Sequence, residues 1–114
     1  MIIEELLYDF LAKNLNANVY IEKPPQPKYP YVLLDRTGGG EVNKGIYQCN
    51  IAIQSFDKSL YMTMHLNRDV KKAMERFNDL SQICKCSLNS DYNFTKANTK
   101  EYRYQAYYNI VYYD

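Results

Sequence analysis

Apolar and polar positions alternate most regularly in the last stretch of the chain, residues 102–113. This stretch is rich in aromatic and β-branched residues and contains neither glycine nor proline, which is typical of a β-strand. One face of the strand is the better core face and carries Tyr102, Tyr104, Ala106, Tyr108, Ile110 and Tyr112. The other face is only half polar and carries Arg103, Gln105, Tyr107, Asn109, Val111 and Tyr113.

This strand would be about 40 Å long if fully extended, roughly twice the usual length. A long strand with almost no charge promotes aggregation when it lies at the edge of a sheet. Only Arg103 and the final Asp114 carry charge that would protect such an edge. We therefore expect the strand to lie inside the sheet or to be covered by another subunit.

The spacing of apolar residues, helical in some segments and alternating in others, predicts the other elements. Apolar residues at helical spacing predict helices over 2–14 and 59–79. Asp57 or Ser59 would cap the second helix, and its apolar stripe would be Met62, Leu66, Val70, Ala73 and Phe77. Alternation predicts four further strands, over residues 19–22, 31–36, 46–56 and 83–88.

Two of these strands have predicted faces. In the strand over 46–56 the inward side chains would be Tyr47, Cys49, Ile51 and Ile53, and the outward ones Gln48, Asn50 and Gln54. In the strand over 83–88, Cys84, Cys86 and Leu88 would share one side. The polar residues 89–100 are predicted to connect this strand to the last one.

Two connections have an unusual composition. Residues 23–30 hold all four prolines, which favours a stiff surface connection over a proline-rich ligand for a recognition domain. The run Gly38–Gly40 is predicted to end the strand over 31–36, and residues 37–45 to form a mobile hairpin loop. A phosphate-binding loop is excluded because the Lys-Ser/Thr pair and a following helix are both missing.

The order of elements is helix, short strand, strand, strand, helix, strand, strand. It predicts an α+β fold, a single largely antiparallel β-sheet with two helices packed on one face. At 114 residues the chain forms one domain, 1–114. Its 46% apolar and 24% charged residues are ordinary for a globular protein.

Charge and cysteine content exclude several classes of partner. A net charge of +1 does not favour specific nucleic-acid binding. No apolar run approaches the ~18 residues of a membrane-spanning helix, and no secretion signal is visible. Three cysteines in such a chain indicate reduced thiols and a cytoplasmic setting.

The sequence shows no catalytic constellation. The only histidine, His65, falls beside the apolar stripe of its helix, where a surface or partly packed side chain is more frequent than a general base. Cys84 and Cys86 are spaced too closely for a usual zinc pair and are predicted to be small buried side chains. We therefore expect no enzyme, no cofactor and no metal site, and we expect the tyrosines to fill the core and to anchor interfaces.

Several segments, in this order, resemble one known family. The N-terminal helix is followed by Val19-Tyr20-Ile21-Glu22 and a proline loop, and then by three further segments: Tyr31-Val32-Leu33-Leu34-Asp35-Arg36, Thr37-Gly38-Gly39-Gly40 and Ile51-Ala52-Ile53-Gln54-Ser55-Phe56. This series is similar to the small tail terminator, or tail completion, proteins of long non-contractile-tailed phages and prophages. The resemblance covers most of the chain, and its motifs are structural.

The resemblance implies a non-enzymatic structural protein of the virion, made in the cytoplasm of the bacterial host. Such a protein forms a homo-oligomeric, hexameric ring on the end of the tail tube, stops tube polymerisation and joins the tail to the head. Its partners would be further copies of itself, the tail tube protein and the head-tail connector protein. The alternatives are a neck or head-completion protein and a small intracellular peptide-binding module.

The candidate interface combines the glycine-containing segment with the outward residues of the last strand. Its members would be exposed in an isolated subunit and buried in an assembly. They are Arg36, Thr37, Gly38, Gly39, Gly40, Tyr107, Val111 and Tyr113.

Overall fold

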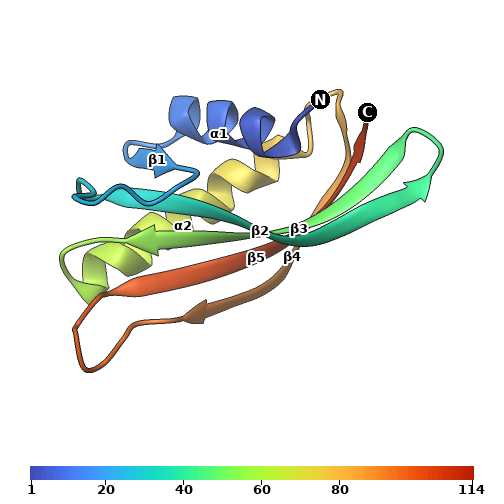
Figure 1. Cartoon of the computed structure of the whole chain (residues 1–114). Helices are drawn as coiled ribbons and strands as arrows, with labels where there is room; N and C mark the ends of the chain where they lie inside the picture. Colours follow the sequence, from blue (N-terminus) through green and yellow to red (C-terminus); the bar gives the residue numbers. More distant parts are fainter.

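Both helices lie on the same face of one five-stranded sheet (Figure 1). The computed structural model describes all residues, 1–114. The elements follow in the order α1 (Ile3–Asn14), β1 (Asn18–Tyr20), β2 (Tyr31–Asn43), β3 (Ile46–Phe56), α2 (Leu60–Phe77), β4 (Ile83–Asn93) and β5 (Arg103–Tyr113).

The sheet order is β1-β2-β3-β5-β4. Only β1 and β2 are parallel, and the other three pairs are antiparallel. The predicted α+β fold, with one largely antiparallel sheet and both helices on one face, is therefore confirmed.

The long last strand lies inside the sheet. β5 pairs with β3 along its whole length and with β4 on its other side, so that Tyr108 lies opposite both Ile51 and Leu88. Its backbone groups are used on both sides. The chain itself thus removes the unprotected edge, and no second subunit is needed to cover this strand.

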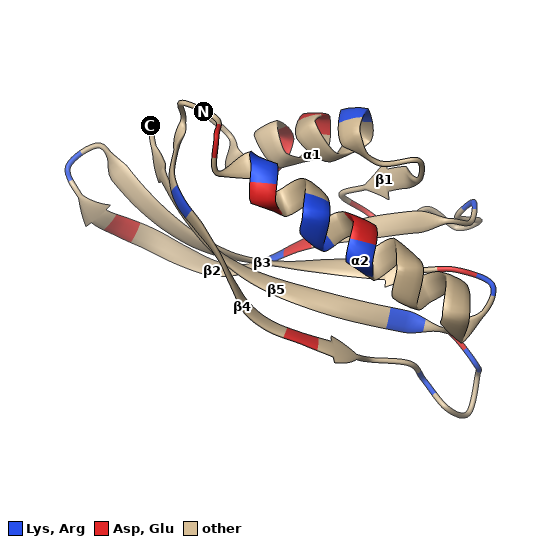
Figure 2. Cartoon of the chain, turned by 180° about the vertical axis from the view of Figure 1, so that it is seen from behind, with Lys and Arg blue, Asp and Glu red and all other residues tan.

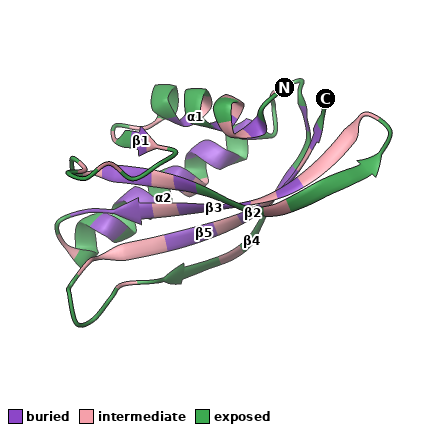
Figure 3. Ribbon diagram, viewed as in Figure 1, coloured by how far each residue is buried: buried purple, intermediate pink, exposed green.

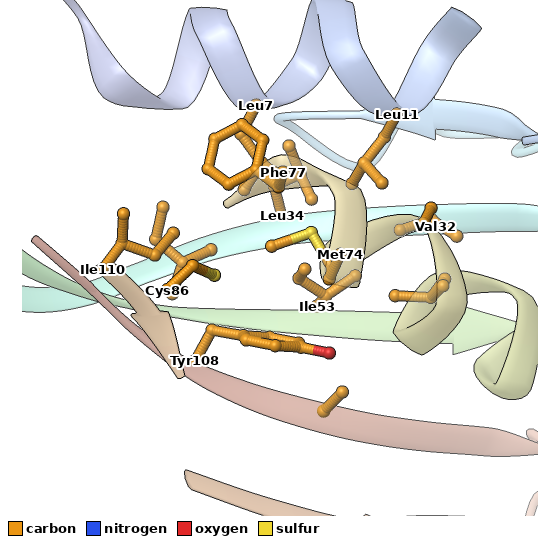
Figure 4. Close-up of a cluster of buried hydrophobic side chains, with 14 of the residues drawn as sticks. Leu7, Leu11, Val32, Leu34, Ile53, Met74, Phe77, Cys86, Tyr108 and Ile110 are labelled. Atoms are coloured by element: carbon orange, nitrogen blue, oxygen red, sulfur yellow. The ribbon is translucent and has the colours of Figure 1, made fainter. Parts of the chain in front are cut away.

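The core lies between the sheet and the two helices (Figure 4). The core face predicted for β5 is correct, because Ala106, Tyr108, Ile110 and Tyr112 are all buried. In β3, Cys49, Ile51 and Ile53 face inward as predicted. The helices contribute their own apolar stripes: Ile3, Leu7 and Leu11 from α1, and Leu66, Val70, Ala73, Met74 and Phe77 from α2.

The second helix begins after Ser59, whose side-chain Oγ accepts a 3.1 Å hydrogen bond from the backbone N–H of Met62. The prediction that Met62 belongs to the buried stripe is wrong, since 45% of this residue is exposed. Thr63 is buried instead. It can be buried because its hydroxyl donates a 2.7 Å hydrogen bond to the carbonyl of Ser59.

The glycine run does not end a strand. β2 continues through it to Asn43 and pairs with β3, so only Lys44 and Gly45 connect the two strands. The predicted mobile loop over 37–45 is therefore wrong. The resulting hairpin extends well beyond the helices and is exposed along β2 (Figures 1 and 3), and the molecule measures 45 × 25 × 25 Å.

Close approach of two backbones explains Gly39. Its φ is +151°, and a Cβ built there would lie 2.5 Å from the carbonyl oxygen of Gln48 on β3. Residue 37 is a bulge, because the register shifts between Arg36 and Gly38. Gly39 therefore allows the β2 backbone to lie close to the β3 backbone next to the bulge. In the sequence alone, the glycine run predicts a turn at this place.

β4 is longer and less regular than predicted. It reaches Asn93, and its register shifts twice, between Ile83 and Lys85 and between Leu88 and Ser90. The first shift turns Cys84 outward while Cys86 stays buried, and Leu88 is 45% exposed. The prediction that Cys84 and Cys86 are both buried on one side is therefore wrong for Cys84, whereas Cys86 and Leu88 do lie on the same side, opposite Ile110 and Tyr108.

Alkylation should distinguish the three thiols. Burial raises the pKa of Cys49 to about 11 and that of Cys86 to about 12, so neither forms much thiolate near neutral pH. Cys84 is exposed. Iodoacetamide at about pH 8 should add one group to the folded chain, as measured by intact mass, and none to Cys84→Ser. Rapid addition of two or three groups to the folded protein would contradict this burial pattern.

Candidate protein interface

The sheet face opposite the helices is largely uncovered. Alternation places the outward side chains of β3 and β5 on this face, and β2 and β4 continue it on either side (Figure 1). Its charged members are few: Asp35, Lys85 and Arg103. Most of this open face is thus made of amide, hydroxyl and aromatic side chains.

A row of amides runs across the open face. Asn50 lies opposite Asn109, and the Nε2 group of Gln48 donates to the Oδ1 atoms of both, at 2.9 Å for Asn50. Further along, the Nε2 group of Gln54 donates to Gln105 Oε1 at 2.8 Å, and Gln105 in turn bonds the hydroxyl of Tyr92. These amides are already paired with one another, so a partner protein can cover them with little loss of hydrogen bonding.

The sequence alone did not reveal this row. It predicted that Gln48, Asn50 and Gln54 face outward, but not which residues of the last strand lie beside them. That information is the register between β3 and β5, two strands far apart in the chain.

The structure brings most of the predicted interface residues together on the open face. The Thr37 and Tyr107 hydroxyls lie 2.6 Å apart, which joins the β2 bulge to β5. Val111 lies opposite Gln48, which in turn lies opposite Gly40. Tyr113 lies at the end of β5 and is 49% exposed.

Two members of the predicted set face the helices instead. Arg36 lies opposite the buried Ile51, and its guanidinium reaches Glu4 of α1 at 3.5 Å and the carbonyl of Gly38 at 3.3 Å. Gly39 lies opposite the buried Cys49. Arg36 thus ties β2 to α1 within the subunit.

An aromatic cluster closes one end of the open face. Tyr31 and Phe56 stack with ring centroids 4.5 Å apart, and both are buried. The loop after β1 contributes Lys23, whose ammonium lies 5.4 Å from the Phe56 ring, while Arg103 lies on the same ring at 5.7 Å. The uncovered part of the face is therefore the part nearer the hairpin.

The only histidine lies on α2, away from the open face. His65 is exposed and lies against the ring of Tyr61, with centroids 4.4 Å apart. No three His, Cys, Asp or Glu side chains lie close enough together to hold a metal ion. Neither helix combines the length and the apolar composition needed to cross a membrane.

No protein-family model matches this chain, and no curated protein sequence matches it.

Proposed function

We propose that this chain is a non-enzymatic structural subunit of a phage or prophage virion. It caps the end of the tail tube, stops polymerisation of the tube and connects the tail to the head. It acts as a ring of identical subunits, for which the family resemblance implies six copies. The tube protein and the head-tail connector are its further partners.

The open face of the sheet is the observation that supports this proposal. A weakly charged face of paired amides and tyrosines, with no helix over it, suits burial against another protein. The projecting β2–β3 hairpin supports it further, because it extends past both helices (Figure 1) and carries the 64% exposed Val42. A hairpin that reaches past its own subunit can contact a neighbouring one.

Solution mass and electron microscopy test the proposal. Purified protein at micromolar concentration should sediment as a closed oligomer, or should assemble into one when tail tube protein is added. Rings should appear on tube ends, and tubes should stop growing. A chain that stays monomeric with and without tube protein would exclude this role and favour the peptide-binding module, whereas rings that bind the connector but never the tube would favour a neck or head-completion protein.

A matched pair of variants connects the test to the open face. Val111→Glu places a charge on the uncovered part of the face, between Gln48 and Lys85, and should weaken assembly by at least roughly tenfold. Lys58→Glu changes the charge at an exposed position just before α2 and should leave assembly unchanged. Equal assembly of both variants would show that the open face is not the contact.

A further inference from the structure

A groove of about 340 Å³ lies between α2 and β4, on the side of the sheet away from the open face. Its floor is apolar and is formed by Met74, Cys86, Leu88 and Tyr108, three of which are labelled in Figure 4. Met74, Cys86 and Tyr108 are buried, whereas Leu88 is 45% exposed although it lies opposite the inward-facing Tyr108. The helix therefore leaves Leu88, at the edge of the core, without a cover.

Two polar bridges hold α2 against β4 at the ends of the groove. At one end, the Asn78 amide donates to the carbonyl of Cys86 at 2.9 Å and accepts from the N–H of Cys86 at 2.8 Å. At the other end, Asp91 accepts from Asn67 at 2.7 Å and from Lys71 at 2.5 Å. The β4 backbone between Cys86 and Asp91 spans about 16 Å, which is the length of four or five extended residues.

The bridge at Asn78 shows which way the β4 backbone points. Because Asn78 bonds both backbone groups of Cys86, these groups face away from β5, toward the free edge of the sheet. Backbone bonding direction alternates along a strand, so the N–H and C=O of Leu88 face the same free edge. Asn78 thus bonds Cys86 in the way that the first residue of an added strand would. The N–H and C=O groups of Leu88 are the next pair that such a strand could bond.

Charge at the rim indicates the kind of segment that fits. Three cations line the groove, Arg68, Lys71 and Lys72, against one carboxylate, that of Glu75. Lys71 is paired with Asp91, but Arg68 and Lys72 form no ion pair. Figure 2 shows blue Lys and Arg positions, with red acidic ones between them, along α2 in front of the sheet. The rim therefore favours carboxylates over ammonium groups.

We propose that this groove binds an extended, acidic segment of a partner protein. The segment lies along the free edge of β4, bonds the backbone of Leu88, places one apolar side chain against Leu88 and Tyr108, and directs a carboxylate to Arg68 and Lys72. This inference goes beyond the capping role and does not depend on ring formation, because the groove and the open face lie on opposite sides of the sheet.

Fluorescence anisotropy with two labelled peptides tests the proposal on the full chain. Each peptide has about eight residues and contains two valines that alternate with charged residues. The charged residues are glutamates in one peptide and lysines in the other. The glutamate peptide should bind with a sub-millimolar Kd, at least roughly tenfold more tightly than the lysine peptide. Raising the salt concentration should weaken its binding, because the rim charges are exposed.

Three variants locate the binding. Arg68→Glu combined with Lys72→Glu should lower the affinity for the glutamate peptide at least roughly tenfold, and so should Leu88→Asp. Lys58→Glu is the matched control, since Lys58 is exposed and lines neither the groove nor the open face, and it should bind like the unchanged chain. All these positions are exposed, so thermal unfolding should confirm that each variant stays folded.

Each other outcome overturns the proposal. Absence of saturable binding would show that the groove takes no such segment, and equal affinity for the two peptides would show that its charge does not select. If instead the chain forms dimers that Leu88→Asp separates, the occupant is a second copy. Because ring mass and peptide binding are measured separately, loss of one leaves the other interpretable.

Discussion

Replacing Tyr108 with alanine should lower the free energy of unfolding by about 3–5 kcal/mol. The ring is 4% exposed and lies between Ile51 and Leu88 in the middle of the sheet. Burial raises the pKa of its hydroxyl well above the ordinary value, which reflects an apolar environment. Its removal leaves a cavity beneath α2 that the surrounding strands cannot close. Urea unfolding followed by circular dichroism measures the loss.

Tyr107→Ala is the control for this prediction, since it removes the same side chain from the neighbouring residue on the open face. Tyr107 is half-buried and its hydroxyl lies 2.6 Å from that of Thr37, so we expect a loss of only about 1 kcal/mol. In Tyr107→Ala the free energy of assembly, measured by sedimentation, should fall by more than the free energy of unfolding. A loss of stability as large as that of Tyr108→Ala, with assembly intact, would show that Tyr107 supports the fold and not the interface.

The second large effect is expected at Gly39. Gly39→Ala places a Cβ 2.5 Å from the Gln48 carbonyl and 3.0 Å from the Cys49 Cα, both of which are backbone atoms of a paired strand. Neither atom can move without breaking the register between β2 and β3. We expect a loss of about 2–3 kcal/mol from the strained backbone and the clash, visible as a lower midpoint of urea unfolding.

Gly40→Ala separates the clash from a general effect of removing a glycine. No atom lies within 4 Å of a Cβ at this position, and the neighbouring strand pairing is the same. The substitution should change stability by less than about 0.5 kcal/mol, or raise it slightly by restricting the unfolded chain. If the two variants unfold alike, close approach is not the reason for a glycine at position 39.

The elements with a clear period were predictable from the sequence. Both helices and the buried face of β5 follow from the spacing of apolar residues, which burial against one core imposes. Met62 is the exception, because its neighbour Thr63 is buried in its place. Thr63 can be buried because its hydroxyl donates a hydrogen bond to the Ser59 carbonyl, which the spacing of apolar residues does not predict. A side-chain hydroxyl that bonds a nearby backbone carbonyl can be buried, and the buried stripe of the helix then differs by one position from the stripe that apolar spacing predicts.

The elements that depend on a partner strand were not predictable. Gly38–Gly40 read as a turn because glycine lowers strand propensity, yet β3 supplies hydrogen bonds along the whole run. Residues 89–93 read as a polar loop, although β5 extends far enough to pair with them. The amide row and the groove beside Leu88 depend on the same long-range register, which local sequence does not encode.

The position of β5 has a consequence for biosynthesis. β5 comes last among the strands but lies between β3 and β4, so every earlier strand of the sheet is made before the one that joins them. While the ribosome still holds β5, the β2–β3 hairpin can form from local contacts, but the inner edge of β3 stays unpaired and Ile51 and Ile53 lack their β5 neighbours. Nascent chains of this protein should therefore need protection from aggregation until β5 has been made and can pair with β3.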